Sequence, residues 1–493
     1  MDPVPDRPTV RSPTSAGGVV NAVAALNRPF SILREYSAFL IAGSVAAIAW
    51  ANLDLTSYQT FLHRVWGHPM LFGREIGHHG FTFHFAVNDI FMAFFFGIAT
   101  KEVVEAFLPG GPLSSPKKAS LPMISTIGGV AGPVLVFVAA CLAAAPYLLR
   151  GWAVPTATDI AYSWLFAGLI FGYKHPATKF LLALAVLDDL IGMVIIAIFY
   201  SSTIQMEWMT LVAAGMMFCG VLRWWVGVKS FWPYLLIGGT LSWFGLLFTG
   251  VHAALALVPI IPLMPSEKRD VGLFEEEDMP EEASPGHAAH PTDALNSFEH
   301  TFKPYVDVGL LTFGLVNAGV PFSAFGLETW ITLAAIFIGK TIGIFLFTVV
   351  GRLARLSLPA GMTMRECFVM GNVAAIGFTV ALFVTDVAFP KAAGADAHAE
   401  GAGHAAEVHD APAHRAPGPS THQEPVVPPP PPGASYEDLS VAQKSLVKDK
   451  VKMGALLSFL AGATSMLLGR LLGVRKISTD AELRERIREL SAA

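Results

Sequence analysis

Two adjacent carboxylates lie in the middle of an otherwise apolar stretch of the chain. Asp188 and Asp189 interrupt the run from Phe180 to Tyr200, which at about 21 residues is long enough to cross a bilayer as one helix. A charged side chain at the centre of a membrane costs about 3 kcal/mol or more, so such residues are rare there and usually serve a function. The pair therefore predicts a membrane-embedded site for a cation, or for a proton that exchanges with one.

Two other apolar runs are broken by polar and helix-disrupting residues. Residues 154–159 contain a proline, two threonines and Asp159, and residues 371–379 combine two glycines with polar groups. Non-helical backbone at membrane depth is tolerated only where protein buries it or where it lines a cavity. Paired interruptions of this kind indicate the substrate site of many transporters. Together they favour a functional site, with backbone and hydroxyl oxygens as ligands for a hard cation.

A single lysine lies in the apolar run 330–350. Lys340 is near the centre of this run, where a lysine must pair with a carboxylate, reach the interface or lose its proton. The expected partners are Asp159, Asp188 and Asp189. The sequence leaves two roles open, a structural salt bridge and a part in proton coupling.

The run that contains Phe95 has polar residues at both of its ends. Asp89, at the outer end, is either a helix cap, which is the favoured interpretation, or a residue of pH response or ion entry. Glu102, at the inner end, is either an interfacial charge or part of an ion-access funnel. His252, alone in another apolar run, is interpreted as a hydrogen-bonded core residue.

The composition indicates a polytopic membrane protein. Of the 493 residues 53% are hydrophobic and only 14% are charged, against about 25% charged in soluble domains. The apolar runs are continuous rather than alternating, which excludes a β-barrel. We therefore predict an all-α polytopic membrane protein with about 12 transmembrane helices. Lysine and arginine concentrate in alternate loops, which predicts that both termini are cytoplasmic.

The chain divides by composition into membrane and extramembrane parts. We predict a cytoplasmic N-terminal tail (1–33) without a removable signal peptide, and transporter spans 1–11 (34–390). A His-, Pro- and Ala-rich extracytoplasmic insert (391–450), span 12 (451–474) and a cytoplasmic tail (475–493) follow. An acidic cluster at 275–282 is interpreted as a solvated loop. The histidines of the insert could bind a transition metal weakly, but a low-complexity insertion is favoured.

Several motifs resemble, in their order along the chain, those of the NhaA-type sodium/proton antiporters. The resemblance runs from about Arg34 to Val474. The matching segments are Asn88-Asp89, Ile127 to Gly129, Pro155 to Ala161, Leu181 to Leu190, Gly250 to Ala253, Asn317 to Val320, Gly339-Lys340 and Gly377 to Thr379. The resemblance implies a fold of inverted repeats in which two broken helices cross. This family is a known example of such a fold.

The same resemblance implies roles for individual residues. Asp188 and Asp189 match the ion- and proton-binding pair, and Asp189 is the nearer analogue of the main sodium ligand. Asp159 and Thr158 match residues where the broken helices cross. Lys340 matches a membrane lysine that is associated with electrogenic exchange.

Positions linked to pH response on the cytoplasmic side match Glu102, Glu299 and His300. Two departures from the family affect this region: residues 101–105 carry fewer positive charges than usual, and Lys303 replaces a second histidine. The insert is also not a usual family feature. These changes leave the ion site intact and bear on the pH at which activity begins.

The resemblance therefore implies a pH-dependent, electrogenic antiporter, not an enzyme, that extrudes Na⁺ or Li⁺ in exchange for external protons. No resident cofactor is expected, since Na⁺ or Li⁺ and H⁺ are the transported ions. The expected partners are the lipid bilayer and these ions, with no nucleic acid, and the family pattern allows for a homodimer. The expected location is the bacterial inner membrane.

Three other functions fit the same residues less well. An intramembrane aspartyl protease needs two aspartates that face each other from two helices, whereas neighbours on one helix diverge by about 100°. A passive channel fits a continuous pore better than broken helices around one deep acid pair. An organic anion/sodium symporter has a similar architecture, but the aspartate pair and Lys340 favour proton coupling.

Overall fold

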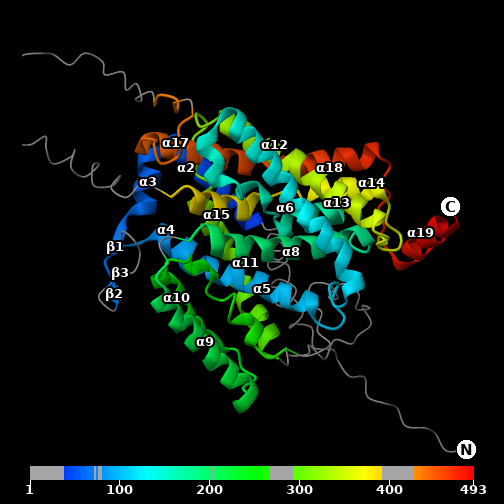
Figure 1. The fold of residues 1–493 in the computed structure, drawn as a ribbon, viewed down its shortest axis with the longest axis horizontal. Coiled ribbons are helices and arrows are strands. Elements are labelled where there is room, and N and C mark those ends of the chain that lie inside the picture. Colours follow the sequence, from blue (N-terminus) through cyan, green and yellow to red (C-terminus); the bar gives the residue numbers. More distant parts are fainter. Residues whose placement is uncertain are drawn as a thin grey trace, which may run out of the picture.

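The computed structural model describes residues 38–71, 74–75, 80–201, 204–266, 293–390, 427–431 and 433–492. These residues are mostly helical, in agreement with the predicted all-α class (Figure 1). The predicted N-terminal tail, the acidic cluster at 275–282 and the histidines of the insert lie outside the described residues.

Within the described residues, five helices are long and apolar enough to cross a membrane. They are α6 (Pro116–Ala144), α8 (Pro176–Phe199), the unit of η4 (Met206–Trp208), α9 (Met209–Val221) and η5 (Leu222–Val226), the unit of α12 (Leu327–Ala334), η10 (Ala335–Lys340) and α13 (Thr341–Leu353), and the unit of α17 (Val441–Leu457) and α18 (Leu460–Leu471).

A sixth span is obtained if a bent pair of helices crosses as one unit. α14 (Met364–Val373) and α15 (Phe378–Ala388) are bent by 50° at their short break. These six spans establish a multi-pass architecture by length and composition, and the count of 12 remains a prediction.

The remaining described helices, most of them shorter, complete the fold. They are α2 (Ala38–Leu53), α3 (Leu55–His63), α4 (Phe83–Phe85), η1 (Ala86–Phe91), α5 (Met92–Phe107), η2 (Pro146–Gly151), η3 (Val154–Thr156), α7 (Ile160–Ile170), η6 (Tyr234–Gly239), α10 (Thr240–Thr249), η7 (Ala253–Leu255), η8 (Ile261–Leu263), α11 (Ala294–Asn317) and α19 (Asp480–Ala492).

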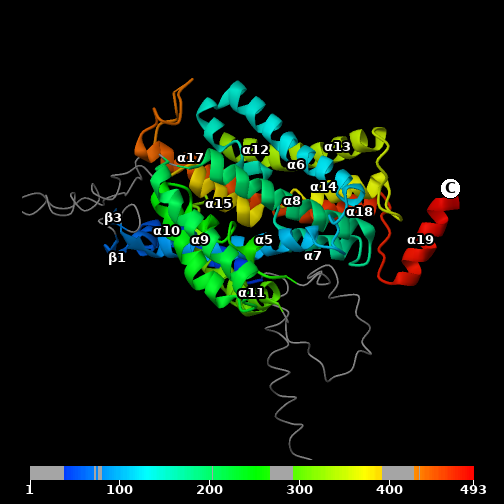
Figure 2. The ribbon, with the colours of Figure 1, turned by 60° about the horizontal axis from the view of Figure 1, so that its bottom comes forward.

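Two small antiparallel sheets lie at the end of the molecule opposite α19 (Figure 1). β1 (Val65–Gly67) pairs with β4 (Phe81–Thr82), and β2 (Met70–Leu71) pairs with β3 (Arg74–Glu75). They lie in the polar segment between α2 and α5, close to the N-terminal end of α17 (Figures 1 and 2).

The helix that carries the aspartate pair runs through the interior. α8 packs against α5, α6 and α7 (Figures 1 and 2), and 67% of its most apolar window is buried, against 28% for α6. Many large apolar side chains elsewhere are exposed, Leu135 at 69% and Trp225 at 87%, as expected of a surface that faces lipid. The aspartates are therefore enclosed by protein.

Glycines allow α6 and the α12–α13 unit to touch backbone to backbone. Gly128 and Gly132 of α6 face Gly339 and Gly343 of the α12–α13 unit, and a Cβ at any of the four would collide with the facing backbone. Small residues at such contacts are typical of membrane helix packing. This contact fixes the helix of Lys340 against α6.

Candidate functional site

The two interrupted segments contact each other at their breaks. Before α7 the chain leaves helical geometry at Ala157, and the break between α14 and α15 lies opposite. The amide of Asp159 donates to the carbonyl of Ile376 at 2.6 Å. A Cβ at Gly377 would lie 2.8 Å from the carbonyl oxygen of Ala157, so glycine is needed for this approach. Backbone groups that the breaks release are thus satisfied by the opposite segment.

Asp159 joins the starts of two helices. Its Oδ1 accepts from the amide of Tyr162 at 3.2 Å and so caps α7. Its Oδ2 accepts from the amide of Thr379 at 3.1 Å and from the hydroxyl of the same residue. A carboxylate is favourable at a helix N-terminus, and here one carboxylate serves both α7 and α15.

Lys340 is fully buried and pairs with Asp188, not with Asp159 or Asp189. Its ammonium also donates to the carbonyl of Thr156 in the first break. The hydroxyl of Thr158 lies 2.5 Å from Asp188 Oδ2. Asp188, on α8, therefore contacts both the first break and the lysine of η10.

Asp189 differs from its neighbour in having no fixed partner. It is 6% exposed, and among the residues that the structure describes its carboxylate takes part in no hydrogen bond or ion pair. The Oδ1 atom of Asp188 likewise has no hydrogen-bond partner within the described part. A buried carboxylate without a partner is costly unless a cation or a proton compensates it. The predicted site residues Asp188, Asp189, Thr158 and Lys340 thus lie together, and Asp159 lies beside them through the break.

Thr379 was not among the predicted site residues, although the structure places it on Asp159. The matching segment from Gly377 to Thr379 was the available signal, because a threonine in the first turn after a glycine break is positioned to offer both its amide and its hydroxyl.

A second cluster of charged side chains surrounds Glu299 on α11. Lys101 of α5, fully buried, pairs with Glu299 and with Glu105, and Lys303 approaches Glu299 at 3.1 Å. Glu102 makes no hydrogen bond or ion pair within the described residues, and His300 is exposed. Of the predicted pH-response residues, Glu299 is central to this group, whereas His300 lies outside it.

The cap interpretation of Asp89 is wrong. Thr82 caps the helical stretch that begins at Phe83, and Asp89 lies inside it, in the π-helical segment η1. Asp89 Oδ1 is instead 3.7 Å from His252 Nδ1. His252 is hydrogen-bonded, as expected, through the amide of Ala254 at 3.3 Å. The apolar run alone did not show that the helix begins a turn and a half earlier.

Comparison with known proteins agrees with this arrangement. A family model described as Na+/H+ antiporter 1 matches residues 31–403. The Na(+)/H(+) antiporter NhaA 1 of Pelobacter propionicus is 46% identical over 368 residues, which cover 74% of this chain and 91% of that protein. The Na(+)/H(+) antiporter NhaA of Geobacter sulfurreducens is 46% identical over 369 residues, with the same coverage. NhaA 2 of Pelobacter propionicus is 38% identical over 460 residues, 92% of this chain and all of that protein.

Proposed function

Since this chain belongs to the Na+/H+ antiporter 1 family, we propose that it exchanges sodium for protons across a membrane at the Asp188–Asp189 site. The observation that supports this most is the contrast within the pair: Asp188 is held by Lys340, while Asp189 is buried and has no hydrogen-bond or ion-pair partner among the described residues. A site with one compensated and one uncompensated carboxylate attracts a single monovalent cation.

Competition at these few charges provides the coupling. Two adjacent carboxylates in a low-dielectric site disfavour joint ionisation, so protons compete with sodium for them. Sodium would be coordinated by Asp189, by the free oxygen of Asp188 and by the hydroxyl of Thr158, all hard oxygen ligands. The protons that leave are released to the side from which sodium arrives.

Lys340 gives the exchange its charge imbalance in this proposal. Sodium that binds to Asp188 removes the lysine's counter-charge, and a fully buried lysine without one loses its proton readily. More than one proton is then exchanged for each sodium ion, which makes transport electrogenic. Lithium, with the same charge and oxygen preference, is proposed as an alternative substrate.

The finer architecture is part of the same proposal. We infer inverted repeats with about 12 spans, in which the breaks before α7 and after α14 cross at the ion site. Both termini are cytoplasmic, the membrane is the bacterial inner membrane, and the group around Glu299 and Glu102 adjusts activity to cytoplasmic pH. A homodimer is allowed by the family pattern.

Everted membrane vesicles test the proposal. Addition of sodium or lithium should cause proton movement, read by the dequenching of a pH-sensitive dye, and Asp189→Asn should abolish it at ion concentrations that saturate the wild type. Asp480→Asn, the same change at an exposed aspartate that pairs with Lys174, is the matched control. Exchange that persists unchanged in Asp189→Asn would contradict the assigned site.

A further inference from the structure

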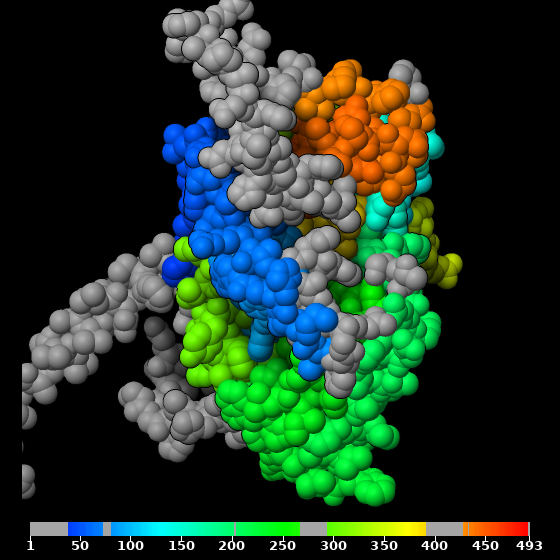
Figure 3. All heavy atoms as spheres, turned by 90° about the vertical axis from the view of Figure 1, so that its left-hand side faces the viewer, coloured from blue at the N-terminus to red at the C-terminus, as the bar shows by residue number. Residues whose placement is uncertain are grey.

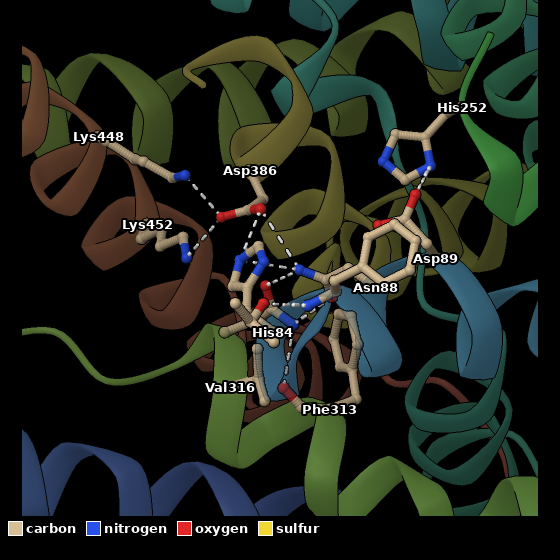
Figure 4. Close-up of polar contacts among 12 residues, drawn as sticks. His84, Asn88, Asp89, His252, Phe313, Val316, Asp386, Lys448 and Lys452 are labelled. Atoms are coloured by element: carbon tan, nitrogen blue, oxygen red, sulfur yellow. Dashed lines mark hydrogen bonds and ion pairs between the residues drawn. The ribbon is translucent and has the colours of Figure 1, made fainter. Parts of the chain in front are cut away.

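A second buried charge cluster lies at the other end of α15. Asp386, whose side chain is 11% exposed, is 2.6 Å from Lys448 Nζ and 3.2 Å from Lys452 Nζ, both on α17 (Figure 4). His84 of α4 approaches the other oxygen of the same carboxylate at 3.0 Å. One carboxylate thus faces three basic groups, and nothing in the sodium site uses them.

The Nε2 atom of His84 lies between a hydrogen-bond acceptor and a donor. It is 3.0 Å from Asp386 Oδ2 and 3.1 Å from the Nδ2 atom of Asn88 (Figure 4). The imidazolium carries a proton on Nε2 and can only donate, here to Asp386. The neutral ring donates to Asp386 in one tautomer and accepts from Asn88 in the other. The amide of Asn88 is oriented by Asn317, whose Nδ2 donates to Asn88 Oδ1 at 2.9 Å. Protonation of His84 therefore removes Asn88 as its hydrogen-bond donor, whereas neutral His84 can bind either partner.

The position of Asp386 connects this choice to the ion site. Asp386 follows Thr379 by seven residues on α15, which places both on one face of the helix, two turns or roughly 10 Å apart. Thr379 binds Asp159 at the break. A short helix held at Asp386 is therefore also held where its first turn contacts the site.

The side chain of His84 can exchange protons with solvent. It is 25% exposed, and it lies in α4, directly after β4 of the small sheets. The end of the molecule that carries these sheets faces the viewer in Figure 3. Histidine is the side chain that changes charge between about pH 5 and 8. This end can thus respond to the pH of one compartment.

Other titratable groups also lie near the cluster, and one of them, Asp449, offsets part of its positive charge. The ring of His63 is 5.2 Å from that of His84. Tyr58 donates to the carbonyl of Leu315, and Asp449 lies close to Lys452. Of the other elements packed on α15, α11 offers the amide of Asn317, and η2 carries Arg150, which pairs with the exposed Glu437.

From this geometry we propose that His84 and Asp386 are positioning residues that form a proton-operated latch on α15. Protonated His84 donates to Asp386 and holds the helix in place; neutral His84 can turn to Asn88, which leaves α15 freer to move during exchange. The latch rests on the antiport proposed above and adds to it a control by the pH at the end where α17 begins.

Proteoliposomes with independently set pH on each side test the latch. Sodium-driven proton movement is measured with the pH at the α17 end near about 6 or about 8 and the other side constant. His84→Gln, a neutral side chain of similar reach, should exchange roughly fivefold faster than the wild type at the lower pH and equally fast at the higher one. His84→Lys, with a fixed charge, should be slow at both.

The outcomes separate the latch from the antiport itself. A rate ratio of His84→Gln to wild type that is the same at both pH values would overturn the latch, as would a His84→Lys variant with wild-type pH dependence. A wild type without sodium-driven proton movement would instead overturn the proposed function. His68→Gln, the same change at an exposed histidine of the same end, is the control, and monodisperse elution of each variant confirms folding.

Discussion

The two buried charge clusters are built from the same residue types in opposite proportion. Around Asp188, two further carboxylates, Asp159 and Asp189, accompany a single lysine, so negative charge is in excess. Around Asp386, two lysines and a histidine contact a single carboxylate, so basic groups outnumber acidic ones among its direct contacts. In the proposed function the first cluster binds a cation, whereas the second compensates its own carboxylate with ammonium groups. Burial of ionisable groups is therefore not enough to define a cation site; the balance of charge decides it.

The largest effect is expected where the excess negative charge is removed. Asp189→Asn should weaken the apparent sodium affinity by at least roughly a hundredfold, since even the loss of an outer partner of a metal ligand costs about 10- to 100-fold. Sodium titration of the dequenching response measures it. An affinity within threefold of the wild type would mean that Asp189 is not a ligand.

Removal of the lysine from the first cluster should change both stability and stoichiometry. Lys340→Ala leaves Asp188 buried without its partner, which should cost about 3 kcal/mol of stability, measured by thermal unfolding in detergent. If Lys340 also carries a proton, exchange becomes electroneutral, and a membrane potential no longer affects its rate. A rate that still responds to the potential would leave the lysine with a structural role only.

Removal of the single carboxylate from the second cluster should weaken the fold and leave ion binding intact. Asp386→Asn strands two lysines that are each less than a tenth exposed, and we expect a loss of about 2 kcal/mol, below the ~3–5 kcal/mol of a fully buried pair. The apparent sodium affinity should stay near the wild-type value. A large loss of affinity would show that the two clusters are not separate in function.

A smaller effect is expected at Lys303, whose fixed charge replaces a histidine of the family pattern. In Lys303→His the imidazole carries its proton below about pH 6.5 and loses it above. Its ion pair with Glu299 is thus present at low pH and lost as the pH rises. The pH profile of exchange should match the wild type near about pH 6 and depart from it above about pH 7.5. Identical profiles would separate this ion pair from pH response.

The smallest effect is expected for an ion pair in solvent. Arg150 and Glu437 are 2.7 Å apart, but their side chains are 43% and 73% exposed. Arg150→Gln should change the free energy of unfolding by less than about 0.5 kcal/mol, as measured by the same thermal assay. A larger change would mean that η2 depends on this contact to hold its place beside α15.

How much of the candidate site the sequence could predict depends on where charged residues lie within the apolar runs. Asp188, Asp189 and Lys340 lie near the centres of such runs, where any charge is conspicuous, and the breaks at 154–159 and 371–379 carry their own signals of proline, glycine and threonine. That Lys340 chooses Asp188 depends on how α12–α13 packs on α6, which no local pattern contains.

The cluster at Asp386 was missed for a physical reason. His84 and Asp386 lie close to the ends of their runs, where charges are common, and Lys448 and Lys452 come from a segment more than 60 residues further along. Asp89 was misread for a related reason: the helix begins at Phe83, in a stretch whose histidine and glycines resemble a loop. The ends of helices are less well defined by hydropathy than their centres.

The glycine contact between α6 and the α12–α13 unit has a mechanical consequence. Because the carbonyls of each helix rest directly on glycines of the other, neither can slide by a fraction of a turn without collision. α6 and the α12–α13 unit, which carries Lys340, therefore keep their relative position and behave as one rigid unit. In the proposed antiport, displacement relative to this unit would then be borne by the breaks at Ala157 and Gly377, and Lys340 would keep its position relative to α6.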